Sequence, residues 1–146
     1  MVTASTVFED VFELMYDETN SAISDPASRG SKWIFSSFPD SSGGTFPGYP
    51  ILVIENPIID SMTTANINRS MWNHMLSVNF SIYDTRASRI DSIGSDIVQA
   101  LKDARTTFRS NGLYNMGISS GRVQTVEHDG HRIHFRVLTV VFDFAD

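Results

Sequence analysis

The hydrophobic and polar positions near the carboxyl end of the chain alternate as in a long β-strand. Ile133, Phe135 and Val137 fall on one face of the segment from His131 to Phe144, and the residues between them are polar. From Val137 onward the alternation stops because the second face becomes apolar as well, which indicates a strand covered on both sides. The pattern predicts a strand with an exposed amino end and a buried carboxyl end.

This strand is long for the size of the domain. Its fourteen residues would span roughly 46 Å at the usual rise per residue, whereas a compact chain of 146 residues is only roughly 38 Å across. Part of the strand must therefore project, bend sharply or meet another chain. Its partner strand is predicted at Gly121 to Glu127, joined through Asp129-Gly130, because Asp-Gly is the preferred pair of a type I′ hairpin turn.

Two amphipathic helices are predicted upstream of this hairpin. The first carries an apolar stripe from Phe8 to Met15, and the second repeats apolar residues at three- and four-residue steps from Ile90 to Phe108. Asn111-Gly112 supplies the left-handed residue that ends the second helix. Each helix is predicted to start at a pair of residues with the spacing of a capping box: Thr6 with Glu9, and Ser88 with Asp91.

Three further strands are predicted between the helices. They cover Lys32 to Phe38, the continuous apolar run Ile51 to Ile54, and Met71 to Asp84. The segment Ile58 to Arg69 is ambiguous, because it starts like a strand and then has the composition of a loop or an extended arm. The order α-β-β-β-α-β-β predicts one α+β domain over residues 1–146. In it, a mainly antiparallel sheet of four to five strands packs against two helices, with a long projecting C-terminal hairpin.

Two segments are candidates for contacts with a partner. The polar face of the strand ending at Asp84 consists of Ser77, Asn79 and Ser81, which are small and neutral, so this face fits either ordinary surface or a contact. The stretch from Pro39 to Pro50 contains three prolines and three glycines and shows no helical or strand period. It fits a mobile surface loop or a partner-binding loop anchored by Phe46 and Tyr49.

Composition narrows the classes of function. The net charge of −6 disfavours a dedicated nucleic-acid-binding protein, because such proteins neutralise phosphates with clustered Lys and Arg. Cysteine is absent, which excludes disulfides, thiolate zinc sites and cysteine nucleophiles. The amphipathic start of the chain argues against a secretory signal, and no apolar run approaches membrane-spanning length. We therefore expect no membrane partner.

No catalytic, cofactor-binding or metal-binding residue is predicted. His128 and His131 should face each other across the hairpin turn, but His134 should lie on the opposite face from His131, which leaves too few converging ligands for a metal ion. No phosphate-binding loop, nucleophile elbow or ordered catalytic triad is present. We expect a non-enzymatic role, and a small α+β enzyme or ligand-binding domain remains the more distant alternative.

The order of elements resembles that of tail terminator and tail-completion proteins of long-tailed double-stranded DNA viruses. The residues that carry the resemblance are Ser81-Ile-Tyr-Asp84, the helix from Ser88-Arg-Ile-Asp-Ser-Ile to Ala100-Leu-Lys, and the terminal strands Arg122 to Glu127 and Arg132 to Phe144. The resemblance covers nearly all of the chain. The long loop from Pro39 to Pro50 and the segment Ile58 to Arg69 depart from the family.

This resemblance implies a structural protein of the virion. In that family the protein forms a ring, usually a hexamer, that caps the tail tube and joins the tail to the neck of the filled head. The implied partners are further copies of the chain, the tail-tube protein and a neck or connector protein. DNA would pass through the lumen without specific binding. The implied location is the tail–neck junction of the virion, and the host cytoplasm during assembly.

Residues at the exposed end of the last strand are candidate contacts in such a ring. We hypothesise that Arg132, His134 and Arg136, with His131 at the turn, meet an acidic surface of a neighbouring subunit. Another head–tail connector, such as a stopper or adaptor, or a protein related to the tail tube is the nearer alternative function.

Overall fold

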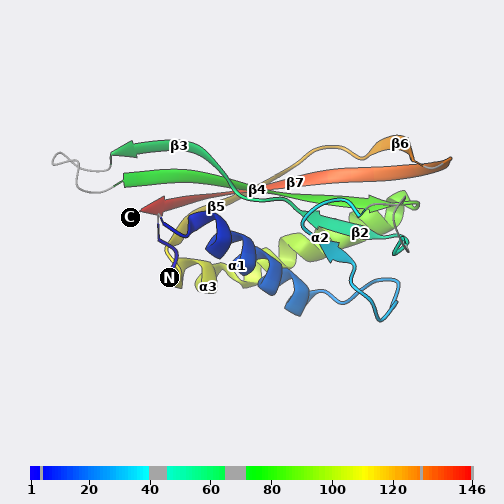
Figure 1. Cartoon of the computed structure of the whole chain (residues 1–146), viewed down its shortest axis with the longest axis horizontal. Helices are drawn as coiled ribbons and strands as arrows, with labels where there is room; N and C mark the ends of the chain where they lie inside the picture. The colour runs from blue at the N-terminus through cyan, green and yellow to red at the C-terminus, as the bar shows by residue number, and fades with distance from the viewer. Residues whose placement is uncertain (4, 40–45, 65–71, 129, 146) are drawn as a thin grey trace.

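The computed structural model describes residues 1–3, 5–39, 46–64, 72–128 and 130–145 of the chain. In this part of the chain, one open sheet is covered on one side by three helices (Figure 1). The predicted α+β class is confirmed, although seven strands and three helices replace the expected four to five strands and two helices. The elements are α1 (Val7–Ala22), β1 (Ile34–Phe35), β2 (Ile51–Ile54), β3 (Ile58–Thr64), β4 (Trp72–Asp84), α2 (Ala87–Asp103), α3 (Arg105–Ser110), β5 (Leu113–Ser120), β6 (Gln124–His128) and β7 (His131–Ala145).

Two long antiparallel strands, β4 and β7, form the middle of the sheet. They contain 13 and 15 residues and pair from Asn73 opposite Ala145 to Asp84 opposite His134. Two short strands share the outer edge of each long strand: β2 and β3 pair with β4, and β5 and β6 pair with β7. The short β1 pairs in parallel with β2. The sheet order is therefore β1-β2-β4-β7-β5. β3 lies beside the amino-terminal end of β4, and β6 lies beside the amino-terminal end of β7.

The elongated sheet accommodates the length of the terminal strand. β6 and β7 form the predicted hairpin, from Gln124 opposite Phe135 to His128 opposite His131. Gly130 has a φ of 76°, as expected for this type of turn, and Asp129 lies outside the described residues. Figure 1 shows that this hairpin reaches beyond the helices at one end, while β3 and β4 do so at the other. The sheet therefore projects at both ends, not only at the predicted hairpin.

Backbone irregularities explain why the sequence pattern left β3 ambiguous and missed β5. β3 shifts register between Ile59 and Ser61, and β5 shifts register between Tyr114 and Gly117, next to Asn115 with a φ of 53°. A bulge adds a residue to one strand and so breaks the period of two on which strand prediction depends. In contrast, the strand predicted over Lys32 to Phe38 is reduced to the two residues of β1.

The helix boundaries differ from the capping predictions. Thr6 precedes α1, but its hydroxyl donates a hydrogen bond to the carboxylate of Asp10 and makes no cap to the backbone. α2 begins at Ala87, also without a side-chain cap, so Ser88 lies inside its first turn. The helix expected to continue to Phe108 divides at Ala104 into α2 and α3. Gly112 follows α3 with a φ of 89°, as predicted for the residue that ends this helical segment.

The core lies between the helices and the sheet face that they cover. Phe108 of α3 meets Phe142 edge-on, with ring centroids 5.3 Å apart. Each large apolar side chain buried in this way contributes about 1.5–3 kcal/mol to folding. The alternate residues of β4 and β7 that point toward the helices are at most 3% exposed: Leu76, Val78, Phe80, Ile82, Leu138, Val140, Phe142 and Phe144. The second apolar face of the last strand is thus buried against the helices, but Val137, Thr139 and Val141 on its other face stay partly exposed. The prediction that the carboxyl half of this strand is covered on both sides is therefore wrong, because the helices cover only one face of the sheet.

Candidate interface surfaces

The face of the sheet opposite the helices carries an uncharged central band, here called the open face. Asp143, opposite Met75 on the same face, places a carboxylate at the end of this band. The band itself consists of six alternate residues of β4 and β7 that point away from the core: Met75, Ser77, Asn79, Val137, Thr139 and Val141. All six are partly or fully exposed. Since solvent-exposed sheet faces usually carry charged side chains, this composition is compatible with contact to another protein.

The three predicted interface residues on β4 have different environments. Ser77 is partly exposed and lies opposite Val141. Asn79 donates from Nδ2 to Glu55 at 3.2 Å and accepts a hydrogen bond from Thr139 at 2.8 Å. Ser81 is only 2% exposed. Of these three, Ser77 and Asn79 belong to the open face, and Ser81 is buried at its border.

An aromatic cluster covers the end of the sheet next to the open face. Phe38 meets the rings of Tyr83 and His128 edge-on, with centroids 4.9 and 5.3 Å apart. The predicted loop anchors Phe46 and Tyr49 pack against each other at 5.3 Å. Phe46 also lies 6.4 Å from His128. Both anchors are therefore partly buried within their own chain, and the cluster as a whole joins the long loop, β4 and the terminal hairpin.

A hollow of about 190 Å³ opens beside this cluster. Tyr83 stacks on Phe135 at 5.7 Å. Burial raises the pKa of Tyr83, and a hydrogen bond with the side chain of Ser81 partly offsets this effect. The hollow is lined by Phe38, Tyr83, Val126, Glu127, His128 and Ile133. The lining is mostly aromatic and aliphatic and includes one carboxylate, that of Glu127. Such a hollow can accept an apolar side chain of a partner.

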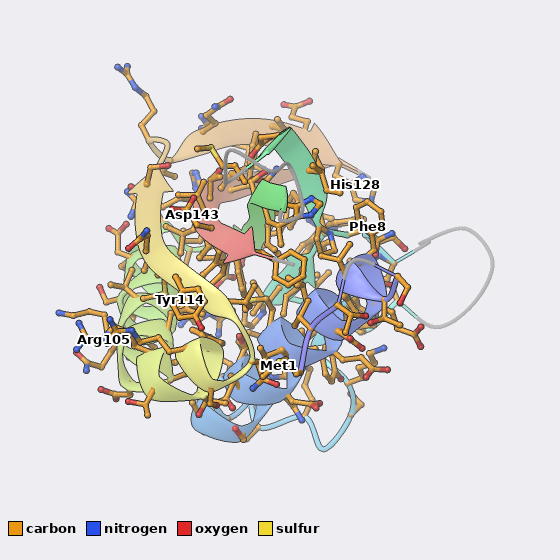
Figure 2. The ribbon with its side chains drawn as sticks, turned by 90° about the vertical axis from the view of Figure 1, so that its left-hand side faces the viewer. Met1, Phe8, Arg105, Tyr114, His128 and Asp143 are labelled. Atoms are coloured by element: carbon orange, nitrogen blue, oxygen red, sulfur yellow. The ribbon has the colours of Figure 1, made fainter. Side chains whose placement is uncertain are left out.

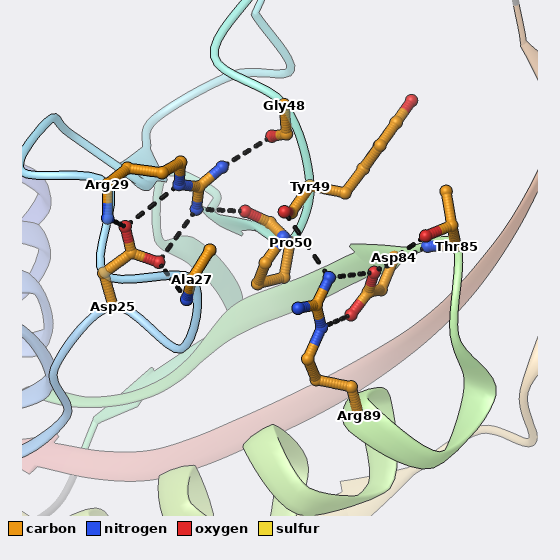
Figure 3. A network of polar contacts seen from close by, with 9 residues as sticks. All are labelled: Asp25, Ala27, Arg29, Gly48, Tyr49, Pro50, Asp84, Thr85 and Arg89. Carbon is orange, nitrogen blue, oxygen red and sulfur yellow. Dashed lines mark hydrogen bonds and ion pairs between the residues drawn. The ribbon is translucent and has the colours of Figure 1, made fainter.

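Two arginines, here called the arginine clamp, hold the backbone that leads from the long loop into β2 (Figure 3). Arg29 donates to the carbonyl oxygens of Pro47, Gly48 and Pro50 at 3.2, 2.7 and 2.6 Å. Arg89 lies within 3.5 Å of the carbonyl oxygen of Tyr49. These contacts fix the backbone around Tyr49 and thereby position its ring in the aromatic cluster.

Each arginine of the clamp is oriented by an aspartate. Arg29 forms a two-point contact with Asp25, at 2.9 and 3.1 Å. Burial opposes ionisation of Asp25, but hydrogen bonds from the side chain of Arg29 and from the backbone of Ala27 and Arg29 outweigh it and lower its pKa. Arg89 donates to both carboxylate oxygens of the fully buried Asp84, and this contact raises the pKa of Arg89. Both ion pairs are charge-assisted and geometrically specific.

The predicted contacts near the terminal hairpin also lie in different environments. His131 and Arg132 are exposed at the turn, with His131 opposite His128. His134 is within hydrogen-bonding distance of the hydroxyl of Thr125, at 2.9 Å. Arg136 forms an ion pair with Asp91 of α2 at 2.9 Å. Arg136 therefore has an acidic partner in its own chain, and Arg132 is the hairpin cation most available to a neighbour.

A groove between α2 and β5, here called the α2–β5 groove, was not predicted from the sequence. Its volume is about 570 Å³. The side chains of Val98, Met116 and Ile118 provide its apolar floor, and Lys102 and Arg105 lie at its margin with Gln99 and Asp103. The groove could not be predicted from hydrophobic periodicity because β5 contains a bulge. The only sequence signal is an apolar face interrupted by this bulge, formed by Leu113, Met116 and Ile118.

The structure shows no metal centre in the part of the chain that it describes: no three His, Asp or Glu side chains converge there. Five hollows among the described residues have volumes between about 190 and 570 Å³. None of the described helices is both long enough and apolar enough to cross a membrane.

Comparison with known proteins shows similarity at the level of the fold. No protein-family model matches the chain, and no curated protein matches it. A chain from the solved structure described as "Virion of native gene transfer agent (GTA) particle" is similar, with a TM-score of 0.57 and 11% sequence identity. The similarity covers 93% of this chain and 95% of that chain. At this identity it shows a shared fold over nearly the full length of both chains.

Proposed function

We propose that this chain is a structural protein of a phage-like virion that assembles into a ring, most simply a hexamer. The ring ends the tail tube and joins the tail to the neck of the head. The observation that supports this proposal most is the full-length fold similarity to a chain from a gene transfer agent virion.

The distribution of surfaces supports a role in assembly. A ring closes only when each subunit offers two different surfaces to its two neighbours. The described part of the chain offers several unlike surfaces: the uncharged open face, the aromatic cluster with its hollow, and the α2–β5 groove with its basic margin. The acidic net charge of −6 suits a lumen through which DNA passes without binding, because every basic contact to phosphate strengthens binding.

Another head–tail connector is the second candidate function. A stopper or adaptor would use the same kinds of surfaces, but it would bind proteins on the portal side in preference to the tail tube. A small α+β enzyme or ligand-binding domain is the third, and a purified monomer that binds a small molecule in one of its hollows would favour it.

Tube assembly in the presence of the chain tests the proposed function. The tail-tube protein would be polymerised alone and with the chain, and tube lengths and ends would be measured by negative-stain microscopy. We expect shorter tubes with an additional ring at one end. Unchanged tubes together with stable binding to portal-side proteins would instead support a stopper or adaptor.

A further inference from the structure

The α2–β5 groove and helix α1 lie on opposite sides of the molecule. In the sheet order β1-β2-β4-β7-β5, α1 packs over β2 near one edge, whereas α3 packs on β5 at the other edge. Figure 2, which views the molecule end-on, shows Arg105 and Tyr114 on one side and Phe8 on the other. A subunit that used both sides would present different surfaces to two neighbours, as a closed ring requires.

The two sides have opposite charge. α1 carries five carboxylates and no basic residue: Glu9, Asp10, Glu13, Asp17 and Glu18. The margin of the α2–β5 groove carries Lys102 and Arg105, which form no ion pair with another described residue, beside one acid, Asp103, that accepts a hydrogen bond from Gln99. Since the basic groups at the groove are unpaired, they are available to the carboxylates of another molecule.

The apolar groups of the two sides are also complementary. Phe8 on α1 is 51% exposed. Phenylalanine is among the residues most often buried in proteins, so this exposed ring is available to a partner. Phe12 lies one helical turn further along the same side and is only partly buried. The floor of the groove is apolar, and its volume of about 570 Å³ lies within the ~300–1,000 Å³ range typical of binding pockets.

We propose that α1 of a second copy of this chain docks in the α2–β5 groove. Phe8 and Phe12 would contact the floor formed by Met116 and Ile118, while Glu9 and Glu13 pair with Lys102 and Arg105. This inference rests on the proposed ring, because it identifies the two surfaces through which neighbouring subunits join. It uses residues that none of the sequence patterns had marked as contacts.

Reciprocal charge reversal tests this docking. One variant carries Lys102→Glu and Arg105→Glu, and the other carries Glu9→Lys and Glu13→Lys. Each variant alone places like charges at every subunit contact. We expect its dissociation constant to rise about fivefold for each of the two pairs, about 25-fold together. Mixing the two variants in equal amounts restores opposite charges at every contact of an alternating ring, so we expect assemblies of even copy number to return.

A matched control separates this contact from a general effect of charge. Arg86→Glu and Arg105→Glu each reverse one exposed arginine at the start of a helix. Arg86→Glu should assemble like the unmodified chain, because Arg86 lies outside the groove. Arg105→Glu should raise the dissociation constant about fivefold, because it reverses one of the two pairs. Native mass spectrometry over a concentration series would give the copy number, and circular dichroism would show that each variant is folded.

The outcomes distinguish the docking from the proposed function. If the unmodified chain forms rings, and the groove variant assembles equally well or the mixture stays dissociated, the docking is wrong while the ring stands. If the unmodified chain remains a monomer at every concentration tested, both the ring and the docking are wrong. Loss of assembly in each variant with recovery in the mixture would support both.

Discussion

Replacing Arg29 by methionine tests the arginine clamp most sharply. The guanidinium group donates five hydrogen bonds, two to the carboxylate of Asp25 and three to backbone carbonyl oxygens at residues 47, 48 and 50. The side chains of Arg29 and Asp25 are only 14% and 11% exposed. Methionine has a similar length but cannot donate a hydrogen bond, so the carboxylate and the three carbonyl oxygens would lose their shared donor.

The expected loss follows from these contacts. Removing one partner of a largely buried ion pair costs about 3–5 kcal/mol, and because water can reach some of the freed oxygens we expect the lower end, about 3 kcal/mol. Chains somewhat larger than this one change in Tm by roughly 2–4 °C per kcal/mol, so Arg29→Met should lower Tm by about 10 °C. Since domains of this kind are stable by about 5–15 kcal/mol, the variant should still fold.

Urea unfolding monitored by circular dichroism would measure this loss. Arg29→Met, Asp25→Asn and the double variant form a cycle, in which we expect a coupling of about 1–2 kcal/mol because the two groups contact each other directly. Arg86→Met is the matched control, since Arg86 is exposed. Stability of Arg29→Met within about 0.5 kcal/mol of the unmodified chain, or strict additivity in the cycle, would refute the role assigned to the clamp.

Three further predictions concern the clamp, the core and the proposed docking of α1. Asp25 has a folded pKa below its ordinary value of 3.8, so its ionised form stabilises the fold above that pH. The stability difference between the unmodified chain and Asp25→Asn, measured by urea unfolding, should be complete at pH 7 and should disappear as the pH falls through the folded pKa; a difference independent of pH would contradict this. Phe142→Ala should cost about 3–5 kcal/mol because Phe142 is 1% exposed in the core, whereas Met75→Ala on the open face, 46% exposed, should cost under about 1 kcal/mol; equal losses in chemical unfolding would argue against this core. Phe8→Ser should leave Tm within a few degrees of the unmodified value but weaken assembly about tenfold in sedimentation velocity, and unaltered assembly would exclude Phe8 as a contact.

Regular patterns in the sequence predicted the central part of the fold. The alternation in β4 and in the amino end of β7 depends on uninterrupted strands that each pack one face on the core, so the period of two survives there. The hairpin was predictable because Asp129-Gly130 specifies a tight turn. β5 was missed and β3 was left ambiguous because each contains a bulge. The division of the second helix at Ala104 could not be predicted, because the apolar residues keep their helical spacing across it.

The candidate surfaces were less predictable because they join distant segments. Arg29 lies 18 to 21 residues from the carbonyl groups that it holds, and no periodic pattern links an arginine to backbone oxygen atoms. Phe46 and Tyr49 were expected to be loop anchors, but the packing of Phe46 against Phe38 and His128, and of Tyr49 against Phe46, depends on the tertiary fold. The pairing of Arg136 with Asp91 likewise depends on how α2 crosses the sheet.

Assembly of the purified chain tests the central claim most directly. Class-averaged negative-stain images, taken together with the mass of the particle, would show its symmetry and copy number. The account predicts closed rings with a central opening, built from identical subunits related by rotation. A particle that stays monomeric at high concentration, or that forms only a two-fold dimer through one self-complementary surface, would contradict it.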